Sequence, residues 1–275
     1  MQAGIVGLGL IGGSMGLALK ETKMFKTVVG LDENPIHAQQ AISLGLVDEC
    51  VNMEEICKCD VVFLAIPVDA IIKTLKTLPN IAAHTTVIDL GSTKAQIVRA
   101  IPPKIRKNFI AAHPMCGTEN FGPKAAFKEL YQGNIVVLTD LEESGELQCA
   151  LAKEIFISIG MTIIRMDSVA HDHHAAFTSH LPHIISYALA NTVLAQEDPQ
   201  SILALAAGGF RDMSRIAKSS ARMWSDISKQ NRAELLGAIE LFGKEMIKAK
   251  TLIKEEQWDA LYAWMQKGNN LHKIF

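Results

Sequence analysis

A glycine-rich segment near the N-terminus has the residue types and spacing of a phosphate-binding turn. The segment GLGLIG (residues 7–12) follows an apolar run and precedes a helical pattern. In such a strand–turn–helix the first glycine permits a tight turn, the second lets backbone approach a pyrophosphate, and the third lets the helix pack on the strand. The free N–H groups of the helix N-terminus favour an anion. An ordinary turn with three glycines is the alternative. We predict a dinucleotide site that includes Gly7, Gly9, Leu10, Ile11 and Gly12.

A carboxylate lies where a dinucleotide site needs one for the ribose. Asp32 ends the second apolar run, about 20 residues after the last glycine, where it can accept a hydrogen bond from a ribose 2′-hydroxyl. Neither Arg nor Lys occurs between Lys26 and Lys58, so no cation is placed to bind the 2′-phosphate of NADP. We therefore predict NAD as the cofactor. Ile66 and Pro67 follow another strand-like run and are expected along the same cleft.

A histidine and a serine are the candidates for chemistry beside that cofactor. His113 ends an apolar run, and a polar residue at a strand end in an α/β sheet points into the ligand crevice. A histidine there can take a hydroxyl proton as hydride leaves, because its pKa lies near working pH. The alternative is a structural histidine bonded to a loop carbonyl. Ser92, at the end of the run in DLGSTK (89–94), could contact cofactor and hold His113 or a substrate alcohol; alternatively it caps a helix starting near Lys94.

Histidines and arginines gather in the second half of the chain. In HDHHAAFTSHLPH (171–183), His180 and His183 are three residues apart and so are neighbours on a helix. We predict no metal site, because HExxH is absent and neither Cys nor carboxylates stand at ligand spacing. Pro182 inside the helical pattern predicts a kink beside these histidines, which suits a pocket wall.

A basic cluster supplies positive charge that the overall composition hides. Arg211, Arg215, Lys218 and Arg222 follow a Gly-Gly turn, and the planar guanidinium fork suits a carboxylate. Most of these side chains are expected to be solvated surface charge, with one or two touching substrate. From spacing alone, we predict a dehydrogenase that acts on a carboxylated alcohol.

The elements that must position these residues change character along the chain. Up to Asp167, seven short apolar runs alternate with helical segments, and runs apolar on both faces are typical of buried parallel strands. After that point only helical patterns occur, including a long stretch over 168–196 and an amphipathic helix over about 231–255. We predict a Rossmann-type α/β domain (1–166) with a parallel-rich, doubly wound sheet, followed by an all-α domain (167–275). The segment 114–133 is irregular and is either a loop or a functional insert.

Composition excludes several classes of protein. With 49% hydrophobic and 20% charged residues, the chain is neither disordered nor a coiled coil. A net charge of −2 disfavours nucleic-acid binding. No apolar stretch approaches the roughly 18 to 20 residues of a membrane span. Five scattered cysteines do not form a disulfide framework. We expect a cytoplasmic protein without nucleic-acid or membrane partners.

Taken together, the motifs resemble the prephenate/arogenate dehydrogenase family of tyrosine biosynthesis. GLGLIGGS, DLGSTK, HPMCGTE, HDHHAAFTSHLPH and GGFRDMSRIA occur in the family's order across nearly the whole chain. The resemblance implies oxidation of prephenate's ring alcohol by NAD⁺ with loss of CO₂, which yields 4-hydroxyphenylpyruvate. It also implies a helical domain that forms much of a homodimer interface. The family's additional regulatory or mutase domains would not fit within this length.

The resemblance also assigns roles to individual residues. His113 matches the catalytic histidine, and Ser92 matches the serine that positions it and the alcohol. His180 and His183 match substrate-pocket histidines. Arg215 matches the arginine that binds a substrate carboxylate. Arg211 is a second candidate for that role, and Trp224, which looks exposed, is assigned either to the dimer interface or to ordinary core packing.

Three other functions stay open from the sequence. Relatives use prephenate, arogenate or both (cyclohexadienyl dehydrogenases), and His183 favours prephenate because arogenate-specific relatives often lack it. A β-hydroxyacid dehydrogenase would need a catalytic lysine, but Lys218 and Lys229 lack a convincing motif. A non-catalytic NAD-sensing module would have no need of a base at His113.

Overall fold

The N-terminal part of the computed structural model, which describes residues 1–274, is built on one eight-stranded sheet. The strand order is β3-β2-β1-β4-β5-β6-β7-β8, and only the β6–β7 pair is antiparallel. The prediction of a parallel-rich Rossmann-type sheet is confirmed. The strands are β1 (Gln2–Val6), β2 (Thr27–Leu31), β3 (Glu49–Cys50), β4 (Val61–Leu64), β5 (Thr86–Asp89), β6 (Phe109–Pro114), β7 (Ile135–Thr139) and β8 (Thr162–Met166).

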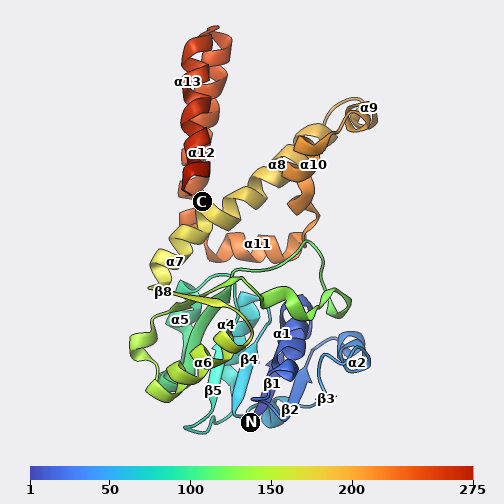
Figure 1. Ribbon diagram of the computed structural model, residues 1–275, viewed down its shortest axis with the longest axis vertical. Coiled ribbons are helices and arrows are strands. Elements are labelled where there is room, and N and C mark those ends of the chain that lie inside the picture. The colour runs from blue at the N-terminus through green and yellow to red at the C-terminus, as the bar shows by residue number, and fades with distance from the viewer. Residues whose placement is uncertain (275) are drawn as a thin grey trace.

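Helices cover both faces of this sheet (Figure 1). The residues of β4 alternate between two cores: Val61 and Phe63 face one, Val62 and Leu64 the other. This two-sided burial explains why its run is continuously apolar. One core includes residues of α1 (Leu10–Glu21), α2 (Pro35–Ser43) and α6 (Glu146–Ser158); the other includes residues of α3 (Met53–Ile56), α4 (Val68–Thr77) and α5 (Ala95–Ala100).

The connection between β6 and β7 contains no crossover α-helix. Residues 115–134 form irregular chain with short 3₁₀ turns at Pro123–Ala125 and Lys128–Tyr131. Without a helix to carry the chain across the sheet, β7 returns beside β6 in the opposite direction.

The chain after β8 is helical. It consists of α7 (Ser168–Ala175), a π turn (Ala176–His180), α8 (Leu181–Leu194), α9 (Pro199–Ala204), α10 (Gly208–Ser214), a 3₁₀ turn (Arg215–Lys218), α11 (Ala221–Gln230), α12 (Arg232–Lys254), α13 (Trp258–Asn269) and a last 3₁₀ turn (Asn270–Lys273). Figure 1 shows two projections above the sheet: an arm made of α8, α9 and α10, and an antiparallel α12–α13 hairpin.

The helical stretch expected over 168–196 is interrupted just before Pro182. The π turn ends at His180, and Pro182 has no N–H for the carbonyl four residues earlier, so the ladder widens in the turn above it. That carbonyl belongs to Thr178; the next one, of Ser179, accepts a hydrogen bond from His183 Nδ1 at 2.9 Å. The disturbance predicted at Pro182 therefore takes the form of a π turn that contains His180 and directly precedes the first turn of α8, which contains His183.

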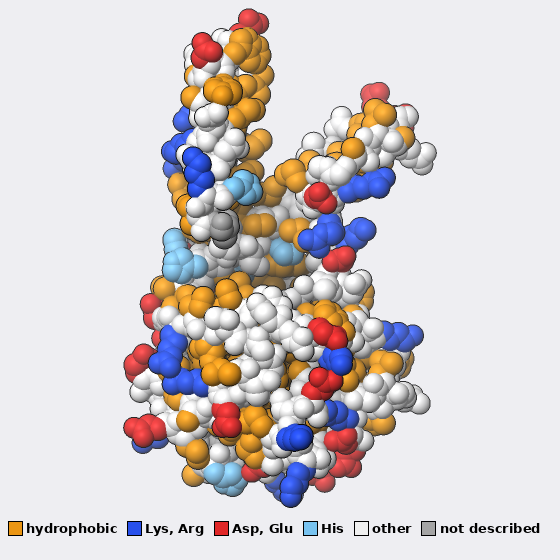
Figure 2. Space-filling model, in the orientation of Figure 1, with side chains coloured by type: hydrophobic (Ala, Val, Ile, Leu, Met, Phe, Trp, Pro, Cys, Tyr) orange, Lys and Arg blue, Asp and Glu red, His pale blue; other side chains and the backbone are white. Residues whose placement is uncertain are grey.

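Large apolar side chains are exposed on the α12–α13 hairpin. Figure 2 shows hydrophobic side chains along much of this projection. They include Leu241, Met246, Ile247, Ile253, Trp258, Tyr262 and Met265. None of the helices in residues 1–274 is long and apolar enough to cross a membrane.

Candidate active site

The glycine loop between β1 and α1 has the shape that a bound pyrophosphate requires. Gly7 has φ +90°, and a Cβ on it would lie 2.4 Å from the carbonyl oxygen of Ala65. A Cβ on Gly12 would lie 1.8 Å from the carbonyl oxygen of Gly7, so both positions must be glycine. A Cβ on Gly9 would meet no atom within 4 Å. Open space at Gly9, next to an α1 N-terminus without a side-chain cap, therefore fits a phosphate group.

The loop's polar and apolar neighbours are those expected for a nucleotide. Asp32 directly follows β2, and its two carboxylate oxygens accept hydrogen bonds from the N–H groups of Leu8 (2.8 Å) and Asn34 (2.9 Å). These bonds fix the carboxylate beside the glycine loop and leave each oxygen further accepting capacity for a ribose hydroxyl. Ile66 borders the loop, because its Cγ2 would lie 2.7 Å from a Cβ on Gly7. Pro67 starts the next helix as the N-cap of α4.

His113 lies in β6 and makes its closest side-chain contact with another histidine. The residue is 9% exposed, and its Nδ1 lies 2.8 Å from Nε2 of His171 in α7. His171 Nδ1 in turn lies 2.8 Å from Oδ1 of Asp172. Among the hydrogen bonds of residues 1–274, none joins Ser92 to His113. His113 is thus held by a histidine–aspartate pair that sequence reasoning missed.

The helix after Ser92 is capped by a residue from the other half of the chain. The N–H groups of Lys94 and Ala95 donate to the two carboxylate oxygens of Asp172, at 2.7 and 2.9 Å. The alternative in which Ser92 caps this helix is therefore wrong, because α5 begins after Lys94 and has no cap from its own side chains.

His113 is held in its neutral form. Burial lowers its pKa well below the usual value for histidine, and the positive charges that His171, Lys94 and His180 can carry lower it further. A neutral imidazole keeps one unprotonated ring nitrogen, which is the form a general base needs.

His180 and His183 lie on the π turn and at the start of α8, against Trp224 of α11. Asn231 Nδ2 donates to the carbonyl of Asp172 at 2.6 Å and lies 3.1 Å from His180 Nδ1. His180 Nδ1 therefore accepts, and the ring proton is on Nε2, which is buried and has no hydrogen-bond partner within residues 1–274. The His183 ring stacks on Trp224 with centroids 3.5 Å apart.

Burial disfavours the charged form of both histidines. Burial lowers the pKa of His180 to about 4, against the opposing effect of Asp172. Burial also lowers the pKa of His183, and the nearby Arg215 contributes to the decrease. They can therefore serve a ligand as hydrogen-bonding groups rather than as cations, which leaves positive charge to the arginines.

Trp224 is buried, so the expectation that it is exposed is wrong. Only 7% of the residue is accessible, and its Nε1–H has no partner among residues 1–274. Its burial favours core packing against the histidines over a position on the surface.

The basic cluster meets the loop after β6. Arg215 lies in the 3₁₀ turn after α10, and its Nη1 is 3.2 Å from the carboxylate of Glu119, in the HPMCGTE segment. The ion pair brings the helical part next to the strand end that carries His113. Arg211 is exposed on α10 and makes no ion pair among residues 1–274. Figure 2 shows Lys and Arg side chains where the α8–α10 arm meets the sheet domain.

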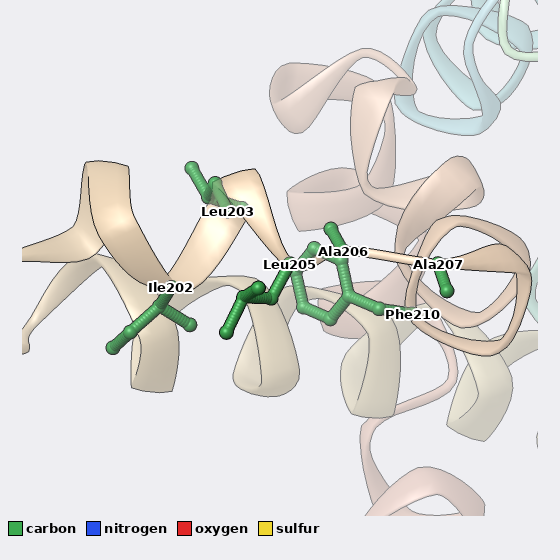
Figure 3. Close-up of a pocket in the computed structure, with 6 residues that line it drawn as sticks. All are labelled: Ile202, Leu203, Leu205, Ala206, Ala207 and Phe210. Carbon is green, nitrogen blue, oxygen red and sulfur yellow. The ribbon is translucent and has the colours of Figure 1, made fainter.

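One cavity lies away from this constellation, and another borders it at Asp172 and Asn231. One, of about 160 Å³, is formed by apolar residues of α9, α10 and their connection and offers no charged side chain (Figure 3). The other, of about 310 Å³, lies between α5, α7 and the α11–α12 junction. No group of three or more His, Cys, Asp or Glu in residues 1–274 is arranged to hold a metal ion.

Comparisons with known proteins find matches for both the sheet domain and the helical part of the chain. Residues 15–165 match the family model described as prephenate dehydrogenase, nucleotide-binding domain, and residues 167–267 match prephenate dehydrogenase, dimerization domain. A cyclohexadienyl dehydrogenase of Zymomonas mobilis is 34% identical to this chain, and the aligned region covers 94% of this chain and 90% of the Zymomonas protein. A Bacillus subtilis prephenate dehydrogenase is 29% identical, and the aligned region covers 97% of this chain and 74% of the Bacillus protein.

A solved structure shares the same fold over the full length. The A. aeolicus prephenate dehydrogenase, in complex with hydroxyphenyl propionate and NAD⁺, superposes with a TM-score of 0.91 at 30% identity, covering 100% of this chain and 98% of its own. A Synechocystis arogenate dehydrogenase superposes with a TM-score of 0.81 at 28% identity, covering 100% and 99%.

Proposed function

The chain belongs to the prephenate dehydrogenase family, and we propose that it oxidises and decarboxylates prephenate at the carboxyl edge of its sheet, with His113 as the base. It is an NAD-dependent oxidoreductase of tyrosine biosynthesis. The product is 4-hydroxyphenylpyruvate. The roles of individual residues are part of the proposal.

One observation carries the assignment of the site. Strands β1, β2, β4, β5 and β6 are mutually parallel, so their carboxyl ends lie at one edge of the sheet. The glycine loop, Asp32, Ile66, Ser92 and His113 follow or end these strands. A dinucleotide cradle and a buried neutral base therefore share one crevice, which is where open α/β sheets bind ligands.

The geometry supports separate roles for the cofactor, for the residues that would hold it, and for the residues that contact the substrate alcohol. When bound, NAD⁺ supplies the hydride acceptor; the loop at Gly7, Gly9, Leu10, Ile11 and Gly12 would hold its phosphates and Asp32 its ribose. His113 takes the proton of the ring hydroxyl as hydride leaves the carbon that bears it, the ring carboxylate departs as CO₂ and leaves its bonding electrons in the ring, and the resulting phenolate oxygen takes the proton back. Ser92 follows β5, three residues after its last residue, and would contact the alcohol or cofactor at the same edge of the sheet. Loss of CO₂ makes the ring aromatic, which makes the step effectively irreversible.

Substrate binding is assigned to the helical part. Arg215 provides a guanidinium fork for a carboxylate, with Arg211 as the second candidate. His180 offers a buried Nε2–H that has no partner within residues 1–274, and a buried donor left unpaired is costly until a ligand accepts from it. His183 lies beside it, stacked on Trp224.

Arg215→Ala is expected to raise KM for prephenate about 10- to 100-fold, because a charged hydrogen bond contributes roughly 1.5–3 kcal/mol. Steady-state kinetics with varied prephenate and saturating NAD⁺ would measure this. Arg222→Ala is the matched control, since Arg222 is exposed on α11 in the same cluster, and it should change KM less than threefold. An effect of Arg215→Ala confined to NAD⁺ affinity would contradict the role assigned to it.

The assignments of substrate and cofactor are tested by a single comparison. Prephenate and arogenate, each with NAD⁺ and with NADP⁺, should give the highest kcat/KM for prephenate with NAD⁺. The carboxylate of Asp32 would repel a 2′-phosphate, so we expect NADP⁺ to be used at least tenfold less efficiently. A higher kcat/KM with arogenate would replace the proposed substrate, and equal use of NADP⁺ would remove the role of Asp32.

The domain boundary and the assembly form part of the same proposal. We place the NAD-binding domain at 1–166 and the helical domain at 167–275; β8 ends at Met166 and α7 begins at Ser168, which supports this division. The helical region matches a dimerization domain. The exposed apolar side chains of the α12–α13 hairpin support a homodimer formed through it. A cytoplasmic location stays a prediction from the sequence.

A further inference from the structure

We propose that Asp172 and His171 keep the ring proton of neutral His113 on Nδ1, so that Nε2 faces the substrate as the proton acceptor. The inference rests on the proposed function, in which His113 is the base. It makes His171 and Asp172 positioning residues, since they act through His113.

Asp172 is the fixed end of the chain of contacts. Its carboxylate accepts from the N–H groups of Lys94 and Ala95 at the start of α5, so it is anchored to the sheet domain although it belongs to α7. Burial raises its pKa, but the hydrogen bonds from His171, Lys94 and Ala95 outweigh that effect, and the net pKa is lowered. An ionised carboxylate can only accept hydrogen bonds, so it determines what its neighbours must donate.

The ionised carboxylate of Asp172 determines which ring nitrogens of His171 and His113 carry a hydrogen. His171 Nδ1, 2.8 Å from Asp172 Oδ1, must carry a hydrogen. In a neutral His171 the other nitrogen, Nε2, then has a lone pair. His113 Nδ1, 2.8 Å from that nitrogen, must therefore donate, which leaves His113 Nε2 unprotonated. The opposite order of donors would place a proton on Nε2 and block the base.

The same chain of contacts also favours the product of proton transfer. When His113 takes the hydroxyl proton it becomes an imidazolium, and its Nδ1–H still donates to His171. The buried Asp172 carboxylate at the end of the chain, which is hydrogen-bonded to His171, favours this positive charge. Both effects act on kcat rather than on substrate affinity.

Helix α7 provides a matched control for a carboxylate-bound histidine. His173 Nδ1 lies 2.7 Å from Oε2 of Glu234, but its side chain is exposed and bonded to α12 instead of β6. Removing His173 deletes a similar imidazole–carboxylate bond without touching His113.

The test compares His171→Leu, His171→Gln and His173→Leu with the natural protein. We expect His171→Leu to lower kcat with prephenate and NAD⁺ about 10- to 1000-fold, below the roughly 10⁴-fold cost of a wrong histidine tautomer in serine proteases, with KM changed less than threefold. His171→Gln should recover part of the loss, because its amide oxygen can accept from His113 Nδ1–H. His173→Leu should leave kcat within twofold.

Nitrogen-15 NMR of histidine-labelled protein reads the tautomer without any turnover. The His113 signals, identified by their loss in His113→Asn, should show a protonated Nδ1 and an unprotonated Nε2 in the natural protein, and a mixture in His171→Leu. A natural protein with the proton on Nε2 would overturn the proposal even if the variants failed to fold. So would a His171→Leu variant with unchanged kcat and tautomer.

The two proposals can fail separately. If the natural protein does not turn over prephenate, the proposed function is wrong, while the NMR tautomer still decides the role of His171 and Asp172. If prephenate is turned over and His171→Leu matches the natural protein in both kcat and tautomer, only the positioning role is wrong.

Discussion

His113→Asn is expected to lower kcat about 10²- to 10⁴-fold, the usual contribution of a positioned general base, while the Kd for NAD⁺ stays within about threefold. Asparagine is similar in size and can still donate an N–H to His171 Nε2, so the packing of β6 should survive. It cannot take a proton at neutral pH, so only the chemical step should suffer. Steady-state kinetics with prephenate and a fluorescence titration with NAD⁺ measure the two quantities independently.

The control for this variant is His84→Asn, because His84 is exposed and lies in the loop before β5. That variant should keep kcat within twofold. Unchanged turnover in His113→Asn would remove His113 from the mechanism, and a lost NAD⁺ affinity would show that its role is structural.

The acid limb of the pH profile follows from the same residue. Burial, together with His171, Lys94 and His180, lowers the pKa of His113 well below 6.5, so the base stays neutral and active as the pH falls through 6.5. Activity is lost only when the pH approaches the lowered pKa. In a profile of kcat/KM, which reports the free enzyme, the acid limb should therefore lie below pH 6.5. A midpoint above 6.5 would contradict the environment described for His113.

Much of the sheet domain could be predicted because its signals are local. Each run buried on both faces, such as 61–64, is apolar throughout, and the glycine loop and Asp32 are recognisable by spacing. Strand β3 was missed because it has only two residues, Glu49 and Cys50, with no apolar pattern. The reversed direction of β7 was not predictable either, because an apolar run does not reveal its orientation.

The support of the site could not be predicted, because its contacts join distant parts of the chain. Lys94 and Asp172 are 78 positions apart, and His113 and His171 are 58 apart. Successive residues of a helix point about 100° apart, so the histidine-rich segment is divided: His171 faces β6, whereas His173 faces Glu234. This division also explains why the crowded histidines do not form a metal cluster.

The burial of Trp224 could have been predicted from the sequence. Trp224 looked exposed because its neighbours are charged, but Trp224 and Ile227 are three residues apart in α11 and both are buried. Helical spacing of apolar residues, rather than the charge of adjacent residues, predicts which side chains face the core.

Lys94→Met is expected to lower the free energy of unfolding by about 3–5 kcal/mol, the usual cost of leaving a buried charge unpaired. The side chains of Lys94 and Asp89 are fully buried and form an ion pair. The Lys94 ammonium also donates to the carbonyl of Ala112 at 2.6 Å, next to His113. Without that ammonium, the donors to Asp89 within residues 1–274 are the N–H groups of Gly91 and Ala112. Urea denaturation followed by circular dichroism measures the loss.

Two further variants separate burial of the charge from loss of the side chain. Lys229→Met removes the exposed partner of Asp69 and should cost at most about 1 kcal/mol, because solvent screens a surface pair. Asp89→Asn combined with Lys94→Met removes both charges and should recover at least half of the loss, because no unpaired ion remains in the core. If the double variant were as unstable as Lys94→Met, the damage would come from packing and not from the charge left on Asp89.

A loss of unfolding free energy below about 1 kcal/mol in Lys94→Met would mean that Asp89 becomes neutral at little cost. That outcome requires a carboxyl group that is easily protonated, and burial raises the pKa of Asp89 against the opposing effect of Lys94. Repeating the denaturation at pH 5 and pH 8 distinguishes the cases, since a protonated Asp89 would make Lys94→Met relatively more stable at the lower pH.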